Sequence, residues 1–231
     1  MTTAPATRRR ELTLSMTGRE LRQFLGAVLP HAGTDPAFPP LTAVTFDAEG
    51  ASLYALATDR YTLGIARHRM AEGVSAPFTL TVAAATVQAI IRQIKPRASV
   101  RLTLTGEGLT IDQLDPQVTY RLPASGERPA LPNWRVWFAE RLAEKPAAVL
   151  TSAHGLALNP AYLARFRSAC RDRLPLEMRP AGRHVAITCG EHFLGLIGPM
   201  DLSKTRAASG DPLDIWLPAL TDAATADRTA A

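Results

Sequence analysis

The chain repeats one pattern, in which a strand is followed by a helix and then by three more strands. The first copy has a strand at 12–14 and a helix at 18–29, in which apolar residues recur at helical spacing. Three strand-like segments follow this helix, at 41–46, 52–57 and 61–66. A unit of this kind predicts an α+β fold.

The second copy begins with a strand at 78–82 and continues through a helix at 83–94, which ends before Pro96. Its three strands fit the segments 100–105, 109–113 and 118–122. The two helices start at Gly18 and Ala83, which are 65 residues apart. A duplicated β-α-β-β-β unit is the simplest account of this spacing.

A proline-rich stretch separates these copies from a third one. Because prolines at this density do not continue a helix or a central strand, we predict a linker at 124–146. The third copy has a strand at 155–158 and a helix capped by Asn159. Its strands fit 174–178, 184–189 and 193–197. We therefore divide the chain into a flexible N-terminus (1–10), the two paired copies (11–123), the linker (124–146), the third copy (147–202) and a mostly flexible tail (203–231).

Composition describes a water-soluble protein with a basic surface. The hydrophobic content is 46%, and no apolar run approaches the roughly 18 residues that a membrane span requires. We expect no membrane association and a cytoplasmic location. The net charge is +5, and most of the basic residues are arginine, which fits an anionic partner such as nucleic acid. The arginine excess could equally reflect a GC-rich genome.

Motifs of enzymes and of metal sites are absent from the sequence. There is no phosphate-binding loop, no His-Glu-x-x-His and no Gly-x-Ser-x-Gly segment. The 5 histidines are scattered, and the two cysteines, Cys170 and Cys189, form no CxxC pair. We expect no catalytic residues, no cofactor and no metal, and we interpret both cysteines as buried, reduced thiols.

Three segments carry a family resemblance. They are 53–63 (LYALATDRYTL), 131–135 (LPNWR) and 196–200 (LIGPM). In this order they resemble the bacterial DNA polymerase III beta subunit, or sliding clamp, family over roughly residues 12–202. The first two copies are similar to the central domain of that family, and the third is similar to part of its C-terminal domain.

The resemblance implies a DNA-clamp-like fold, with helices on one face of antiparallel sheets. In the family, the helices line a hole for DNA and the sheets form the outer wall. Nothing in this sequence corresponds to the family's N-terminal domain, and the segment between Arg135 and Leu158 is too short for the first half of a C-terminal domain. Ring closure in the family uses these parts, so a ring of this chain would need a different geometry.

The family binds short peptides of its clients in a hydrophobic pocket. Carried over by position, the pocket residues are Leu41, Thr58, Arg60, Tyr61, Leu63, Pro132, Val136, Trp137, Ile197, Pro199 and Met200. The sequence departs from the family at Gly198-Pro199-Met200, where many clamps have Met-Pro-Met. The same residues could instead simply hold the junction between copies together.

Basic residues recur on the polar sides of all three predicted helices. The candidate DNA-facing residues are Arg19, Arg22, Arg92, Lys95, Arg97, Arg165, Arg167 and Arg171. A surface of this kind suits phosphate contacts without base readout. Ordinary solvated helix faces in an arginine-rich protein would give the same pattern.

The tail contains one apolar segment, Pro212-Leu213-Asp214-Ile215-Trp216-Leu217-Pro218. Two interpretations stay open. The segment could cap an exposed sheet edge or apolar patch, or it could occupy the peptide pocket of its own or a neighbouring chain.

The resemblance implies a tethering and processivity protein of DNA replication or repair. Its partners would be double-stranded DNA, bound non-specifically, and DNA polymerase or other clamp-binding proteins; a homo-oligomer is left open. In the alternative, the fold serves as a regulatory or ligand-binding module that forms no ring.

Overall fold

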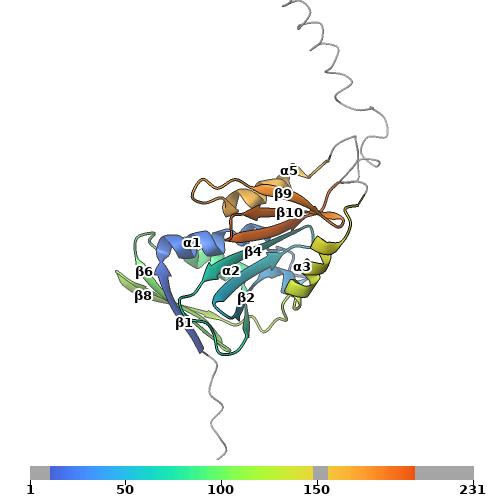
Figure 1. Cartoon of the computed structure of the whole chain (residues 1–231). Helices are drawn as coiled ribbons and strands as arrows, with labels where there is room; N and C mark the ends of the chain where they lie inside the picture. Colours follow the sequence, from blue (N-terminus) through green and yellow to red (C-terminus); the bar gives the residue numbers. More distant parts are fainter. Residues whose placement is uncertain (1–10, 148–155, 201–231) are drawn as a thin grey trace, which may run out of the picture.

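The computed structural model describes residues 11–147 and 156–200, which form two antiparallel sheets (Figure 1). The four-stranded sheet has the order β1 (Glu11–Thr17), β6 (Ser99–Thr105), β7 (Gly108–Leu114) and β8 (Gln117–Pro123). The seven-stranded sheet has the order β5 (Phe78–Ala83), β2 (Ala43–Glu49), β3 (Ser52–Thr58), β4 (Thr62–Arg69), β11 (Phe193–Ile197), β10 (His184–Cys189) and β9 (Glu177–Ala181).

The first two units exchange their first strands. Strand β1 pairs with β6 of the second unit, from Glu11 opposite Thr105 to Thr17 opposite Ser99. In return, β5 of the second unit pairs with β2 of the first. The third unit continues the sheet of the first, because β11 pairs with β4. The predicted linker therefore separates segments in sequence, whereas the seven-stranded sheet is continuous across them.

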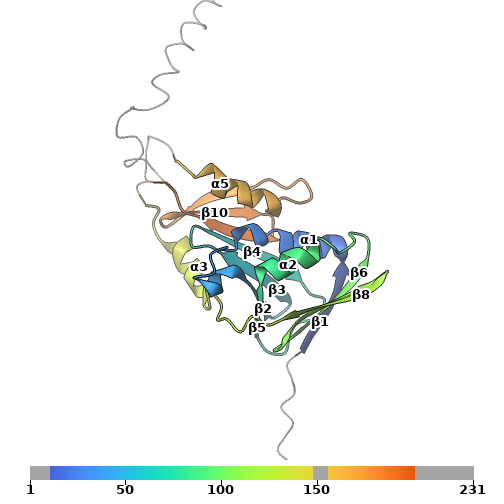
Figure 2. The ribbon, with the colours of Figure 1, turned by 180° about the vertical axis from the view of Figure 1, so that it is seen from behind.

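Helices α1 (Gly18–Gly26), α2 (Ala84–Ile91) and α5 (Pro160–Leu163) lie on one side of the sheets (Figure 2). A capping box starts α1, in which the Glu20 amide donates to Thr17 Oγ1 and the Thr17 amide donates to the Glu20 carboxylate. Asn159 caps α5 by accepting from the Ala161 amide at 2.9 Å. Their apolar sides contribute Leu21, Phe24, Leu25, Val87, Ile91 and, from the following 3₁₀ turn η3 (Ala164–Ala169), Phe166 to the main core.

Helix α3 (Trp134–Ala143) lies inside the stretch interpreted as a linker. Pro132 lies before the helix and Pro146 lies after it. The ten residues between its ends contain no proline, so a helix can form there. Trp134 and Phe138 are buried on the sheet face opposite α1 and α2. The Trp134 indole N–H also donates to Asp47 of β2 at 2.7 Å.

The seven-stranded sheet is consequently buried on both faces. Along β3, Leu53 and Ala55 belong to the core under α1 and α2, whereas Leu56 belongs to the smaller core under α3. This double burial explains why residues 43–48 of β2 are all buried, although the polar Thr45 and Asp47 alternate with apolar residues along the strand.

Other boundaries differ modestly from the sequence prediction. Strand β2 begins two residues late because a 3₁₀ turn, η2 (Pro39–Thr42), precedes it; another, η1 (Leu29–His31), follows α1. The predicted strand at 174–178 is displaced to β9, and the third helix tightens into 3₁₀ geometry after Leu163. Cys189 is buried, but Cys170 is exposed, contrary to expectation.

Several predictions fall on other parts of the chain. The N-terminus at 1–10, the tail at 203–231 and the apolar segment at 212–218 lie outside the described residues. Residues 156–158 are described and form no strand. In the described part of the chain, no helix is both long and apolar enough to span a membrane.

Candidate peptide pocket and basic helix face

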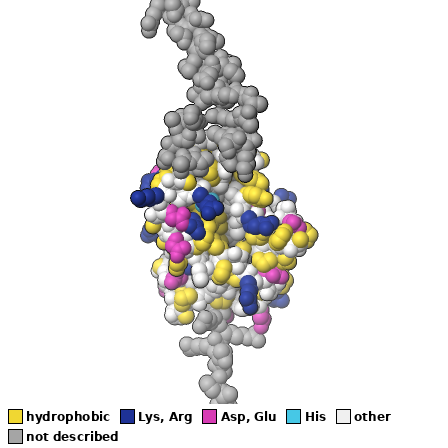
Figure 3. All heavy atoms as spheres, turned by 90° about the vertical axis from the view of Figure 1, so that its right-hand side faces the viewer, with side chains coloured by type: hydrophobic (Ala, Val, Ile, Leu, Met, Phe, Trp, Pro, Cys, Tyr) yellow, Lys and Arg dark blue, Asp and Glu magenta, His cyan; other side chains and the backbone are white. Residues whose placement is uncertain are grey.

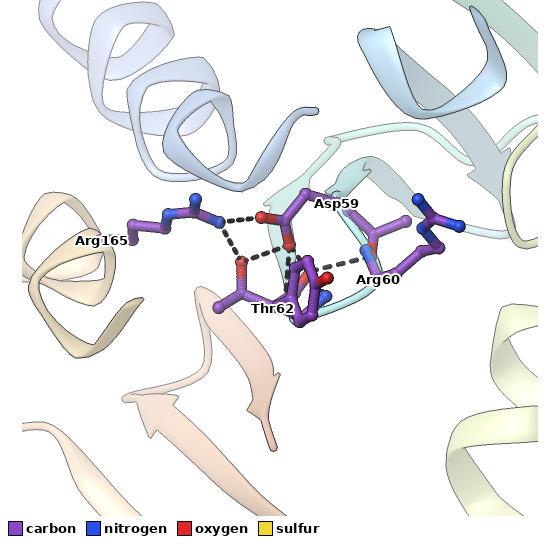
Figure 4. A network of polar contacts seen from close by, with 6 residues as sticks. Asp59, Arg60, Thr62 and Arg165 are labelled. Atoms are coloured by element: carbon purple, nitrogen blue, oxygen red, sulfur yellow. Dashed lines mark hydrogen bonds and ion pairs between the residues drawn. The ribbon is translucent and has the colours of Figure 1, made fainter. Parts of the chain in front are cut away.

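The turn between β3 and β4 is fixed by side-chain hydrogen bonds (Figure 4). The amides of Tyr61 and Thr62 donate to Asp59 Oδ1 at 3.0 and 2.8 Å. The Thr58 hydroxyl donates to the Thr62 carbonyl at 2.8 Å and accepts from the Arg60 amide. Arg60 has a φ of 79°, a left-handed conformation that these bonds stabilise. The turn therefore presents Arg60 and Tyr61 in a fixed direction.

Arg165 of η3 reaches this turn from the third unit. Its guanidinium pairs with the Asp59 carboxylate and donates to Thr62 Oγ1 at 2.9 Å. Burial alone would raise the pKa of the Asp59 carboxyl, but the hydrogen bonds from Arg165 and from the Thr62 amide outweigh it and hold that pKa below its usual range. Arg165 is thus a link between units, so we remove it from the proposed DNA-facing residues.

A pocket of about 270 Å³ lies beside the turn. It is closed by residues from β3, β4, α3, β10 and β11, so it depends on the contact between the first and third units. Six of the residues predicted for the peptide pocket line it: Leu41, Thr58, Arg60, Tyr61, Leu63 and Trp137. The remaining lining residues are Thr62, Ala130, Leu131, His184 and Leu196.

The other five predicted pocket residues do not line the cavity. Ile197 is fully buried in the main core, because alternation along β11 turns Leu196, rather than Ile197, toward the pocket. Val136 is 62% exposed, and Pro132 is exposed as well. Pro199 and Met200 follow Gly198, whose amide approaches the Tyr61 carbonyl at 3.4 Å. They therefore lie near the pocket without forming its wall.

One of the residues that the prediction missed, Leu196, had a detectable signal in the sequence. Leu194 and Leu196 alternate with Phe193 and Ile197, and Leu63 pairs directly with Leu196. A strand with apolar residues on both sides predicts two buried faces, and this would have pointed to Leu196. His184 begins a strand that is distant in sequence, and no local pattern marks it.

Aromatic and basic groups form the rim of the pocket. Tyr61 is 58% exposed and stacks on Tyr162, with ring centroids 5.2 Å apart. The Arg60 guanidinium lies 4.2 Å from the centre of the Phe38 ring and, within the described residues, has no ion-pair partner. Burial, together with nearby arginines, lowers the pKa of His184. The pocket thus has apolar walls, aromatic side chains at its edge and the Arg60 guanidinium on its rim.

Figure 3 looks onto the side of the molecule on which α3 lies. Hydrophobic side chains reach the surface there between separate groups of basic and acidic side chains. An apolar surface of this kind, interrupted by charges, is typical of a site for a protein segment.

Five of the predicted DNA-facing residues are exposed on or next to α1 and α2: Arg19, Arg22, Arg92, Lys95 and Arg97. Helix α1 begins against the segment that follows α2, since the Gly18 amide donates to the Ala98 carbonyl and the Arg19 amide to the Pro96 carbonyl, both at 2.8 Å. A Cβ on Gly18 would lie 2.1 Å from the Lys95 carbonyl oxygen, so only glycine permits this approach. The contact brings Arg19 beside residues 95–97, and the five cations form one basic helix face.

The third unit contributes less to this surface than the sequence suggested. Arg167 is exposed, but the Arg171 side chain is only 19% exposed. Burial lowers the pKa of Arg171, and its Nε atom lies 3.9 Å from the Asp172 carboxylate. The Asp172 carboxylate oxygen Oδ1 also lies 3.9 Å from the Nη2 atom of Arg19. Within the described residues, no group of three or more His, Cys, Asp or Glu side chains could hold a metal ion.

Paired β-α-β-β-β units that exchange strands, with helices on one side and sheets on the other, give this chain the same fold as bacterial sliding clamps. No family model and no curated protein matches the chain. Among solved structures, it is similar to the DNA polymerase sliding clamp of Bacillus subtilis, with 11% identity and a TM-score of 0.61 over 87% of this chain and 67% of that one.

Two further solved structures give the same result. The DNA polymerase III beta subunit of Thermotoga maritima has 15% identity and a TM-score of 0.60, over 83% of this chain and 65% of that one. The sliding clamp of Pseudomonas aeruginosa has 12% identity and a TM-score of 0.61, over 87% and 68%. The chain therefore spans about two thirds of the length of these clamps. The predicted resemblance and the α+β fold are confirmed.

Proposed function

We propose that this protein is a clamp-like tethering factor of DNA replication or repair that acts in the cytoplasm. It binds duplex DNA without sequence preference and holds a client, DNA polymerase or another clamp-binding protein, through the pocket. No enzymatic step is part of this function. The observation that carries the proposal is the pocket itself, which the clamp fold builds at the junction of its first and third units.

The chemistry of the pocket supports a peptide as the ligand. Leu63, Leu131 and Leu196 provide apolar walls, and Tyr61 and Trp137 provide aromatic surfaces. Such a site takes an aliphatic or aromatic anchor, whose burial supplies most of the binding energy. A volume of about 270 Å³ suits one or two such side chains rather than a folded domain.

The basic helix face supports DNA as the second partner. Its side chains are exposed, and Arg19 alone among its five residues has an ion-pair partner in the described chain, at 3.9 Å. Cations of this kind release counterions when they meet phosphates, which gives a salt-dependent, sequence-independent affinity.

Retention on circular DNA tests the tethering role. The protein is loaded on closed circular duplex DNA in moderate salt, and the DNA is then linearised. Loss only after linearisation is expected if the protein encloses the duplex. Equal loss from circular and linear DNA would contradict a topological clamp.

A second function is favoured by one observation, namely that all described walls of the pocket belong to a single chain. Client binding therefore needs no ring, and the protein could act as a regulatory or ligand-binding module. Native mass, measured by light scattering over a concentration series, separates the two functions. A discrete oligomer supports a ring, whereas a monomer that still binds peptide supports the module.

A further inference from the structure

The described chain leaves the fold at the edge of the pocket. Gly198 contacts Tyr61, a pocket residue, through its amide, and the Met200 amide donates to the Ala157 carbonyl at 2.9 Å. Met200, the last described residue, therefore lies two residues beyond a contact with the pocket rim. Any apolar segment that follows closely is tethered beside an apolar site.

One such segment exists, and its residues match the pocket. Of residues 201–231, Trp216 is the only aromatic one, and three large aliphatic residues lie within three positions of it: Leu213, Ile215 and Leu217. An aromatic group with aliphatic neighbours is the kind of anchor that the walls around Trp137 and Leu196 accommodate.

The charges of the segment also match the rim. Asp211 precedes the apolar residues, and Asp214 lies between Leu213 and Ile215. Arg60 stands on the rim and, in the described ranges, pairs with no carboxylate. In Figure 4 the Arg60 side chain points away from Arg165, on the other side of the turn. It is thus free of the Asp59–Arg165 contact and available to an acidic segment.

The length of the connection permits binding within one molecule. Leu213 follows Met200 by thirteen residues, which span at most about 45 Å when fully extended. A short tether of this kind raises the local concentration of the segment to the millimolar range. A weak site is largely filled under these conditions without any partner.

We propose that the segment 211–218 occupies the peptide pocket of its own chain and competes with client peptides. This inference rests on the proposed function, because it assigns an internal competitor to the same pocket. The segment is thus a tethered competitor for the client site, and a client must displace it.

Competition with a free peptide tests the proposal. The probe is a fluorescently labelled peptide of residues 211–218, and its affinity for the full chain is measured by anisotropy. Ile215→Ala with Trp216→Ala removes the internal anchor, and Leu220→Ala is the matched control outside the segment. The double variant should bind the probe about 10- to 100-fold more tightly than the native chain, given an effective concentration of about 1 mM and a Kd of about 10–100 μM for the segment. The control should match the native chain.

The outcomes separate the two proposals. Equal probe affinity for all three proteins would overturn the internal competitor and leave the client pocket intact. Absence of binding to any of them would overturn both. Adding Tyr61→Ala to the double variant should weaken probe binding about tenfold, because Tyr61 lines the pocket.

Tryptophan provides a second readout that does not depend on an added ligand. The chain has 3 tryptophans, so fluorotryptophan labelling gives three signals in ¹⁹F NMR. Trp216→Ala should shift the signal of Trp137, which lines the pocket, and leave that of Trp134, which is buried against Asp47. An unchanged Trp137 signal, or a shift that depends on protein concentration, would overturn occupancy by the same chain. A lowered melting temperature with an unchanged Trp137 signal would identify the segment as a structural cap instead.

Discussion

Asp59 and Arg165, which are 106 residues apart in sequence, form an ion pair that joins the turn of the first unit to the 3₁₀ turn of the third. Both side chains are largely buried, and the same Asp59 carboxylate fixes the conformation that presents Arg60 and Tyr61. Packing between units and the geometry of the pocket rim therefore depend on one contact.

Asp59→Asn should lower the free energy of unfolding by about 1–3 kcal/mol, because it leaves the Arg165 guanidinium partly buried without its anion. The folded pKa of Asp59 lies below its unfolded value, so the stabilisation is complete above about pH 4 and is lost as the pH falls below that value. Urea unfolding at pH 7 and pH 3 should show the difference shrinking in acid. Glu72→Gln, at an exposed position, is the control.

His31 should make the protein less stable as the pH falls from about 6.5 to 4. The ring is fully buried against Phe166, with centroids 4.7 Å apart, and neither ring nitrogen has a hydrogen-bond partner among the described residues. Burial, reinforced by Arg165, lowers its pKa from 6.5 to about 4. Between these pH values His31 is protonated in the unfolded chain but neutral in the folded one. The free energy of unfolding therefore falls by about 3 kcal/mol across this range.

His31→Phe removes the ionisable group and keeps an aromatic ring in place. The variant should unfold with a free energy that changes less between pH 6.5 and 4 than that of the native protein. If both proteins lose stability equally over this range, His31 is not the responsible group.

Tyr61→Ala should weaken binding of a client peptide about tenfold, since truncating an aromatic contact residue typically costs 1–2 kcal/mol. Val136→Ala should leave the affinity unchanged, because Val136 lies outside the pocket. Anisotropy of a labelled peptide checks both variants in the Ile215→Ala, Trp216→Ala background. Equal losses in the two variants would show that the pocket is wrongly placed.

Arg92→Glu with Lys95→Glu should weaken binding of duplex DNA and flatten its salt dependence. Each lost phosphate contact reduces the slope of log affinity against log salt by about 0.9. Arg101→Glu with Arg121→Glu makes the same change of charge at exposed positions of β6 and β8 and should have a smaller effect. Identical salt slopes for the two double variants would refute a specific role of the basic helix face.

The repeat could be read from the sequence because its signals are local. The helix of the first unit has its capping pair, Thr17 and Glu20, and its apolar side within a few residues. The exchange of β1 and β5 between sheets could not be read in this way, because both strands satisfy the same alternation in either sheet. Pairing of Leu63 with Leu196 is equally non-local.

The pocket could be predicted in part. Thr58 and Tyr61, which the resemblance assigned to the peptide pocket, line the cavity beside the turn. Ile197, which the resemblance also assigned to the pocket, lies in the main core instead, because neighbouring residues of a strand point to opposite faces. Helix α3 was missed because proline density was given more weight than the spacing of Trp134 and Phe138, which are four residues apart and share one helix face.

Because β11 pairs with β4, the pocket is completed late in the synthesis of the chain. During synthesis, the wall that contains Thr58 and Leu63 leaves the ribosome more than a hundred residues before Leu196. A nascent chain therefore carries half of a pocket, with Leu63 and its neighbours uncovered, until its last strand docks. The pocket is complete only once β11 has paired with β4, so under the proposed function a chain broken off before β10 would be unable to recruit a client.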